Sequence, residues 1–130
     1  MKLSSTHVLI AIAVLGIGLI GGAKLLEQKK SAVADGRYTQ FAECLAEKGA
    51  TFYGAFWCPH CQEQKALFGD AASKLPYVEC STADKSAQTQ ICIDKKITSY
   101  PTWILADGQI LNGAISLAEL SEKTTCELPL

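Results

Sequence analysis

The longest apolar stretch of the chain lies near its N-terminus. Val8–Ile20 is apolar or glycine without interruption, and the uncharged run extends from Leu3 to Ala23. This run of about 21 residues is close to the ~20 that a helix needs to span a bilayer. We therefore expect a transmembrane anchor at residues 1–23, a linker at 24–36 and a single folded domain at 37–130.

A signal peptide is the alternative reading of the same stretch. Gly21-Gly22-Ala23 and Ala32-Val33-Ala34 both have the small-residue form of a cleavage site. The second of these is separated from the apolar run by several lysines, which argues against cleavage there. We expect the segment to be retained as an anchor.

Along residues 37–130, the spacing of apolar positions changes from the period of a helix to that of a strand and back several times. Gly49 and the Asp107-Gly108 pair mark a helix end and a turn, and Ser116 with Glu119 marks a helix start. Ile91 and Ile97 are expected to face the core. The predicted elements are a helix at Tyr38–Lys48, a strand at Thr51–Phe56, a helix at Pro59–Leu75, a strand at Pro76–Cys80, a helix at Ala87–Lys96, a hairpin of Pro101–Leu105 and Gln109–Asn112, and a helix from Leu117 to Lys123.

This order predicts an α/β fold. A helix joins the first two strands, and such a crossover makes them parallel, whereas the hairpin adds an antiparallel pair. Helices are expected on both faces of the resulting sheet.

Two cysteines follow the first predicted strand in the segment Trp57-Cys58-Pro59-His60-Cys61. A helix that begins at Pro59 places Cys58 at its N-terminus, where unpaired N–H groups and the helix dipole favour a thiolate. Cys61 lies three residues later on the same helix face, within reach for a disulfide. The pattern predicts a thiol–disulfide redox site.

Zinc binding and a purely structural disulfide are the alternatives for Cys58 and Cys61. The sequence offers no second Cys-x-x-Cys or His-x-x-x-His to complete a tetrahedral zinc site, so we expect no metal. A disulfide that closes so short a loop removes little chain entropy and would stabilise the fold weakly.

Charge and cysteine content indicate which partners and which cellular compartment to expect. The 130 residues carry a formal net charge of −1, which gives no indication of a nucleic-acid partner. Six cysteines in so short a chain favour an oxidising compartment. Lys24, Lys29 and Lys30 weakly favour a cytoplasmic domain by the positive-inside rule. We give the cysteines more weight and expect the domain outside the cytoplasm.

The cysteine motif, together with Tyr100-Pro101-Thr102 before the hairpin, resembles the thioredoxin superfamily. The segments Phe41–Leu45, Tyr53–Trp57, Tyr77–Cys80 and Tyr100–Trp103 are more narrowly similar to the thioredoxin-like domain of bacterial and plant homologues of vitamin K epoxide reductase. The resemblance implies a central mixed four-stranded sheet flanked by helices. It also implies exchange of disulfides with substrate proteins, without a cofactor of the domain's own, and reoxidation by a quinone-coupled membrane oxidase of the vitamin K epoxide reductase or DsbB type. The chain contains no such four-helix reductase, so this partner is expected to be separate.

The resemblance also implies roles for the residues of the motif. Cys58 is expected to be the exposed nucleophile and Cys61 its buried partner. The Pro59-His60 pair is that of the oxidant DsbA, and His60 is expected to lower the pKa of Cys58. A lower pKa stabilises the reduced form and makes the protein a stronger oxidant, by about 30 mV for each unit in this two-electron couple. A solvated His60 without effect is the alternative.

Substrate binding is expected beside the motif. Pro101 matches the superfamily's cis-proline, which exposes the backbone of the preceding residue, here Tyr100, to an extended substrate. Trp57 is expected to offer an apolar platform. Thioredoxins place a buried Asp six residues before the first cysteine, and Phe52 stands there in this chain. Glu43 and Glu79 are candidates to replace it as the proton acceptor.

The other four cysteines allow three pairings. We prefer Cys80–Cys92, which joins the second strand to the next helix, and Cys44–Cys126, which joins the first helix to the C-terminal region. A second redox pair that relays electrons is the alternative for Cys80–Cys92. A disulfide reductase or isomerase, or a non-enzymatic metal or redox binding module, is the alternative for the chain as a whole.

Overall fold

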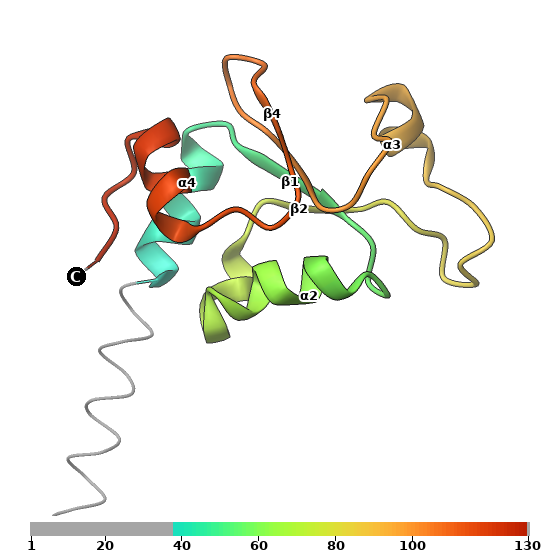
Figure 1. The fold of residues 1–130 in the computed structure, drawn as a ribbon, viewed down its shortest axis with the longest axis horizontal. Coiled ribbons are helices and arrows are strands. Elements are labelled where there is room, and N and C mark those ends of the chain that lie inside the picture. The colour runs from blue at the N-terminus through green and yellow to red at the C-terminus, as the bar shows by residue number, and fades with distance from the viewer. Residues whose placement is uncertain (1–37, 130) are drawn as a thin grey trace, which may run out of the picture. The chain divides into compact units, whose positions relative to one another are not determined.

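A mixed four-stranded sheet organises the part of the chain that the computed structural model describes, residues 38–129 (Figure 1). The strand order is β2-β1-β3-β4. β1 pairs in parallel with β2 and antiparallel with β3, and β3 pairs antiparallel with β4. The sequence predicted this arrangement of parallel and antiparallel pairs correctly. The strands are β1 (Thr51–Gly54), β2 (Tyr77–Glu79), β3 (Thr102–Ile104) and β4 (Ile110–Asn112).

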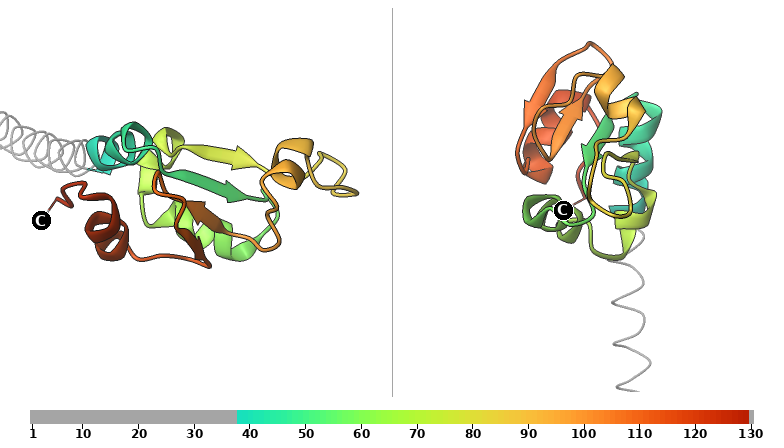
Figure 2. Two further views of the ribbon diagram at one scale, coloured as in Figure 1. Left: turned by 90° about the horizontal axis from the view of Figure 1, so that it is seen from above. Right: turned by 90° about the vertical axis from the view of Figure 1, so that its right-hand side faces the viewer.

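Helices surround this sheet. In Figures 1 and 2, α2 runs along one side of the strands, whereas α3 and α4 lie toward opposite ends of the sheet. The chain leaves β1, turns and enters α2, so the start of α2 lies at the end of the sheet nearer to α3. The helical segments are residues 38–47, α2 (Pro59–Ala66), the 3-10 helix η1 (Gly69–Lys74), α3 (Gln90–Asp94) and α4 (Leu117–Thr124).

Two of the predicted helices are shorter than the sequence indicated. The helix expected over Pro59–Leu75 ends at Ala66 and is followed by η1. The break coincides with Gly69, whose φ of +56° is left-handed and interrupts a continuous right-handed helix. The helix expected over Ala87–Lys96 begins only at Gln90, because Gln88 forms a bridge with Ser81 instead.

Ile91 was expected in the core and is exposed, with half of its surface open to solvent. Its neighbour Cys92 points inward and is bonded to Cys80. Consecutive helix residues lie about 100° apart around the axis, so one of these two side chains must face away from the core. Ile97, in contrast, is buried as predicted.

The core lies in two clusters on opposite faces of β1. Phe52 belongs to the larger cluster and stacks on Trp103 at 4.9 Å between ring centroids. Cys61 of α2 and Leu120 of α4 contribute to the same cluster. Successive strand residues point to opposite faces, and Tyr53 accordingly belongs to the smaller cluster. The other buried members of the smaller cluster are Cys80, Cys92 and Ile97.

The local start and stop signals read from the sequence occur where they were expected. Ser116 Oγ accepts a hydrogen bond from Glu119 N at 3.1 Å and caps α4. Gly108 adopts a left-handed φ of +83° in the turn between β3 and β4, where Asp107 Oδ1 accepts from Gln109 N.

Within residues 38–129, no helix has both the length and the hydropathy that crossing a membrane requires. The predicted anchor at residues 1–23 and the predicted linker at 24–36 lie outside the described residues.

Candidate active site

The loop between β1 and α2 places Cys58 at the start of a helix. Cys58 N donates to Ala55 O at 3.0 Å, which closes a turn directly after the strand. Cys58 occupies the N-cap position of α2, Pro59 follows in the first turn, and Gln62 N donates to Cys58 O at 3.2 Å. No side chain caps this helix end. The Cys58 sulfur therefore lies where the helix dipole stabilises negative charge.

Cys58 and Cys61 are both free thiols in this structure and differ in accessibility. Cys61 is 1% exposed, and Cys58 is 6% exposed. The sequence prediction of an exposed Cys58 was therefore wrong for the residue as a whole, although Cys58 is the more accessible of the pair. The loop that contains Tyr100 lies against it, and Cys58 Sγ approaches Tyr100 O at 3.7 Å.

Burial raises the pKa of Cys61 to about 12, and the neighbouring Cys58 adds to this rise. The Ala55 backbone and the positive charge of Lys65 act in the opposite direction. Cys61 is therefore a neutral thiol near pH 7, unable to attack until it loses a proton. Cys58, at the helix N-terminus and nearer to solvent, occupies the position of the attacking sulfur.

His60 has a different contact from the one the sequence suggested. Its Nδ1 lies 2.9 Å from Glu63 Oε2, and both side chains are exposed. A carboxylate beside the imidazole offsets the positive charge that His60 would carry when protonated. The expected effect of His60 on Cys58 remains a prediction.

The loop before β3 faces the cysteines. The peptide bond between Tyr100 and Pro101 is cis, and Pro101 is fully buried. Gln88 Nε2 donates to both Tyr100 Oη and Ile97 O at 2.8 Å, which ties this loop to the segment before α3. The Tyr100 carbonyl oxygen is thereby held beside Cys58 Sγ.

Aromatic side chains border the site. Trp57 is 44% exposed, packs edge-to-face against Tyr100, and donates from Nε1 to Ser81 Oγ at 2.8 Å. Phe56 is exposed to a similar degree. Trp57 and Tyr100 therefore form an apolar surface next to Cys58. The sequence led us to expect such a platform from Trp57 alone. Phe56, Ser81 and Gln88 were not assigned to the site from the sequence, because no motif points to them.

A cluster of polar side chains lies near Cys61, and only one of its members was expected from the sequence. Phe52 occupies the position of the absent acid and makes an edge contact with Tyr77. Tyr77 Oη donates to Glu79 Oε2 at 2.7 Å, and Lys65 Nζ lies 3.4 Å from the centroid of the Tyr77 ring. Glu79 was a candidate from the sequence, whereas Tyr77 and Lys65 were not. Glu43, the other candidate, instead pairs with Lys74 at 3.9 Å.

The remaining cysteines form the two preferred disulfides. Cys80 is bonded to Cys92, with 5.5 Å between their Cα atoms, and Cys44 is bonded to Cys126, with 5.9 Å. Cys80 and Cys92 have no exposed surface, so an attacking thiolate cannot reach either sulfur in the folded state. This burial favours the structural interpretation over an electron relay. In residues 38–129, no three His, Cys, Asp or Glu side chains are grouped as metal ligands would be.

Comparison with known proteins agrees with this geometry. The family model described as Thioredoxin matches residues 37–125. The chain is also 49% identical over 87 residues to the thiol-disulfide oxidoreductase LTO1 of Arabidopsis thaliana. The match covers 64% of this chain and 23% of that protein, so the chain spans about a quarter of the length of this relative.

Proposed function

Because the chain belongs to the thioredoxin family, we propose that it is a thiol–disulfide oxidoreductase that exchanges disulfides with proteins through Cys58 and Cys61. The observation that supports this most strongly is the pairing of a helix-capping Cys58 with a buried Cys61, both free, beneath the Tyr100 carbonyl. The similarity to a protein named as a thiol-disulfide oxidoreductase agrees with it.

In the proposed oxidising direction, the substrate attacks the Cys58–Cys61 disulfide. A substrate thiolate forms a bond to Cys58 Sγ, the bond between the two protein sulfurs breaks, and its electron pair stays on Cys61, which takes up a proton. A second substrate thiolate then attacks the substrate sulfur of the mixed disulfide and releases Cys58 as a thiolate. The substrate has lost two electrons, and the protein holds two thiols.

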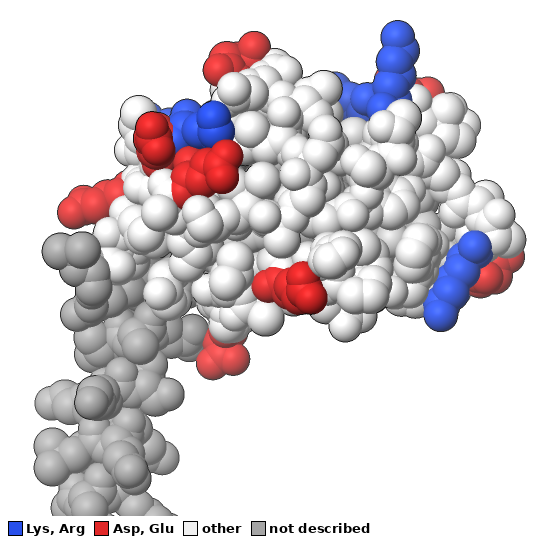
Figure 3. Space-filling model, viewed as in Figure 1, with Lys and Arg blue, Asp and Glu red and all other residues white. Residues whose placement is uncertain are grey.

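Substrate contact in this proposal involves Trp57, Phe56 and the backbone of Tyr100. The two aromatic rings offer exposed apolar area, and the Tyr100 carbonyl accepts hydrogen bonds from an extended chain. The face in Figure 3 carries acidic and basic side chains singly or in small groups around a broad uncharged area. At the proposed contact itself, the exposed rings of Phe56 and Trp57 carry no charge, which suits unfolded substrate segments of varied sequence.

The location and the partner belong to the same proposal. We place the domain outside the cytoplasm, tethered by a single span at residues 1–23, where a membrane oxidase of the vitamin K epoxide reductase or DsbB type reoxidises it. The two disulfides outside the motif support an oxidising compartment. A tether raises the effective concentration of the domain near a membrane partner. A membrane-impermeant thiol reagent tests the location, since labelling of Cys58 only in broken cells would place the domain in the cytoplasm.

The direction of electron flow is tested by the equilibrium of Cys58–Cys61 with glutathione. An oxidase is expected nearer the potential of DsbA, about −120 mV, than that of thioredoxin, about −270 mV. His60→Ala is expected to lower the potential by tens of mV if His60 stabilises the Cys58 thiolate. A thioredoxin-like potential would favour a reductase, and stoichiometric metal binding without turnover would favour a binding module. An unchanged potential in His60→Ala would remove His60 from the mechanism.

A further inference from the structure

Cys61 requires a proton acceptor when the protein is reoxidised, and the position of the usual acid is occupied by Phe52. In that step the partner is bonded to Cys58, and Cys61 must attack Cys58 Sγ. With a pKa of about 12, Cys61 holds its proton at neutral pH. Hydroxide is too dilute there to remove it quickly, so the step gains from a general base near the sulfur.

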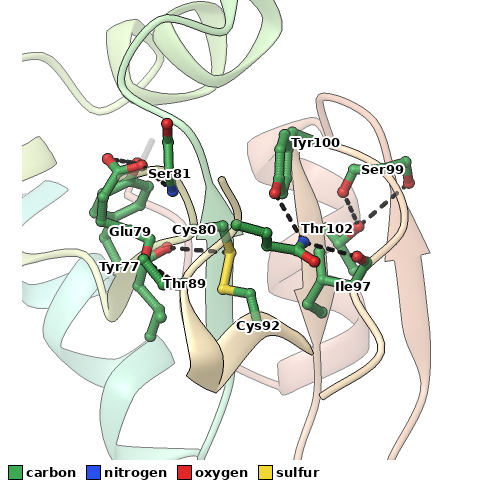
Figure 4. The surroundings of a disulfide bond; sticks show 12 residues. Tyr77, Glu79, Cys80, Ser81, Thr89, Cys92, Ile97, Ser99, Tyr100 and Thr102 are labelled. Atoms are coloured by element: carbon green, nitrogen blue, oxygen red, sulfur yellow. Dashed lines mark hydrogen bonds between the residues drawn. A yellow bond between two sulfur atoms is a disulfide. The ribbon is translucent and has the colours of Figure 1, made fainter. Parts of the chain in front are cut away.

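The strand beside Phe52 brings polar groups to this point. In the parallel pairing of β1 with β2, Phe52 lies opposite Tyr77, and Gly54 lies opposite Glu79. Tyr77 and Glu79 are two residues apart, so their side chains emerge on the same face of the sheet. Figure 4 shows the two side chains side by side, joined by their hydrogen bond.

Gly54 allows the buried sulfur to approach this pair. A Cβ at position 54 would lie 2.9 Å from Cys61 Sγ and 3.0 Å from Tyr77 Cε2. Because both atoms lie within 3.0 Å of one point, they are at most about 6 Å apart. The edge of the Tyr77 ring therefore lies beside the Cys61 sulfur, and bridging water can connect this sulfur to the hydroxyl at the end of the ring.

Three hydrogen bonds hold the Glu79 carboxylate in place. Its Oε2 accepts from Tyr77 Oη at 2.7 Å, and its Oε1 accepts from Ser81 N at 2.9 Å and Phe56 N at 3.3 Å. The bond to Phe56 N connects the carboxylate to the segment that precedes Cys58. Burial and the neighbouring carboxylate raise the pKa of Tyr77, so the phenol keeps its proton and can pass one on.

We propose that Glu79 is the proton acceptor for Cys61 and that the Tyr77 hydroxyl connects the two. In the step, the Cys61 sulfur forms a bond to Cys58 Sγ, the bond from Cys58 to the partner breaks, and the partner sulfur leaves with the electron pair. The Cys61 proton moves through bridging water to the Tyr77 hydroxyl, while the hydroxyl proton moves to Glu79 Oε2. The proposal rests on the proposed disulfide exchange.

The pH at which Cys61 loses its proton also depends on other groups around Tyr77 and Glu79. Lys65 of α2 lies over the Tyr77 ring, and its charge favours the Cys61 thiolate. Cys58, which caps α2, disfavours that thiolate, and β1 contributes no charged group at Phe52 or Gly54. Lys85, from the segment before α3, lies over the Phe56 ring at 5.5 Å.

A two-phase reaction of the reduced full-length chain with dithiobis(nitrobenzoate) tests the proposal. Cys58 releases one chromophore when it reacts, and Cys61 releases the second when it attacks the mixed disulfide. In Glu79→Gln, the second phase is expected to slow about 10²-fold near pH 7 and to gain tenfold per pH unit, because hydroxide replaces the base. The first phase is expected to stay within about twofold of wild type. Tyr77→Phe is expected to show the same selective slowing.

Glu43→Gln is the matched control, because it removes an exposed carboxylate that pairs with Lys74. It is expected to leave both phases unchanged. Equal slowing of both phases in Glu79→Gln would mean that Glu79 only holds the loop through Phe56 N, and an unchanged second phase would mean that Glu79 takes no proton. Either result overturns the proposal but not the proposed disulfide exchange, because a first phase that still occurs, even slowly, reports reaction at Cys58.

Discussion

The cysteine pairs Cys58–Cys61 and Cys80–Cys92 both connect a strand region to a helix, and their surroundings differ. Cys58 caps α2 and retains some exposed surface, whereas Cys80 and Cys92 have none. Cys61 lies beside Tyr77, whose side chain contacts Glu79 and Lys65, whereas Cys80 and Cys92 pack with Tyr53 and Ile97. The pair proposed to exchange disulfides therefore differs from the structural pair in two ways. One of its sulfurs retains exposed surface, and the other lies near polar side chains.

The largest expected effect on the contrast between the two cysteine pairs comes from replacing the sulfur atoms of the first pair. Cys58→Ser is expected to abolish disulfide exchange, because no other free thiol among residues 38–129 caps a helix. Cys61→Ser is expected to accumulate mixed disulfides with substrates, since the resolving thiol is absent. Non-reducing electrophoresis followed by mass spectrometry measures the captured species. Capture by Cys58→Ser and none by Cys61→Ser would reverse the two roles.

The structural pair is tested through stability. Cys80→Ala/Cys92→Ala is expected to lower the free energy of unfolding by about 3 kcal/mol, the chain-entropy value for a closed loop of this length. The rate of exchange at Cys58 is expected to change by less than about twofold. Chemical denaturation and an exchange assay on the same sample measure both quantities.

Cys44→Ala/Cys126→Ala is the matched control for this test. It opens a longer loop and is expected to cost about 4.5 kcal/mol. A loss of exchange in the Cys80/Cys92 variant without a loss of stability would support the electron-relay alternative and contradict the structural role.

The smallest effect concerns the pH dependence of stability in the reduced protein. The folded state raises the pKa of Cys61 from 9.0 to about 12, so the unfolded chain releases this proton first as the pH rises. The stabilisation is complete below pH 9 and declines above it, by at most about 1.4 kcal/mol per pH unit. Denaturation of reduced wild type and Cys61→Ala between pH 8 and about 10.5 measures the difference. If the free energy of unfolding depends on pH in the same way in both proteins, folding does not raise the pKa of Cys61.

The sequence predicted the order of the elements well and their lengths less well. The Ser116 cap and the Asp107-Gly108 turn depend on nearby backbone groups, so local sequence is sufficient to locate them. The long helix expected after Cys58 was wrong because apolar spacing does not reveal a left-handed Gly69. Ile91 was misplaced because the Cys80–Cys92 bond decides which side of α3 faces inward.

The sequence by itself determined where Cys58 and Cys61 lie relative to each other. Their spacing and the proline between them place two thiols on the first turn of a helix, and both properties are local. Only the tertiary structure decided what surrounds these thiols. Tyr100 reaches Cys58, and Tyr77 and Glu79 reach the region of Cys61, because the pairing of β1 with β2 and β3 brings distant segments together. Contacts of this kind depend on register and packing across the sheet, which the spacing of residues along one chain does not encode.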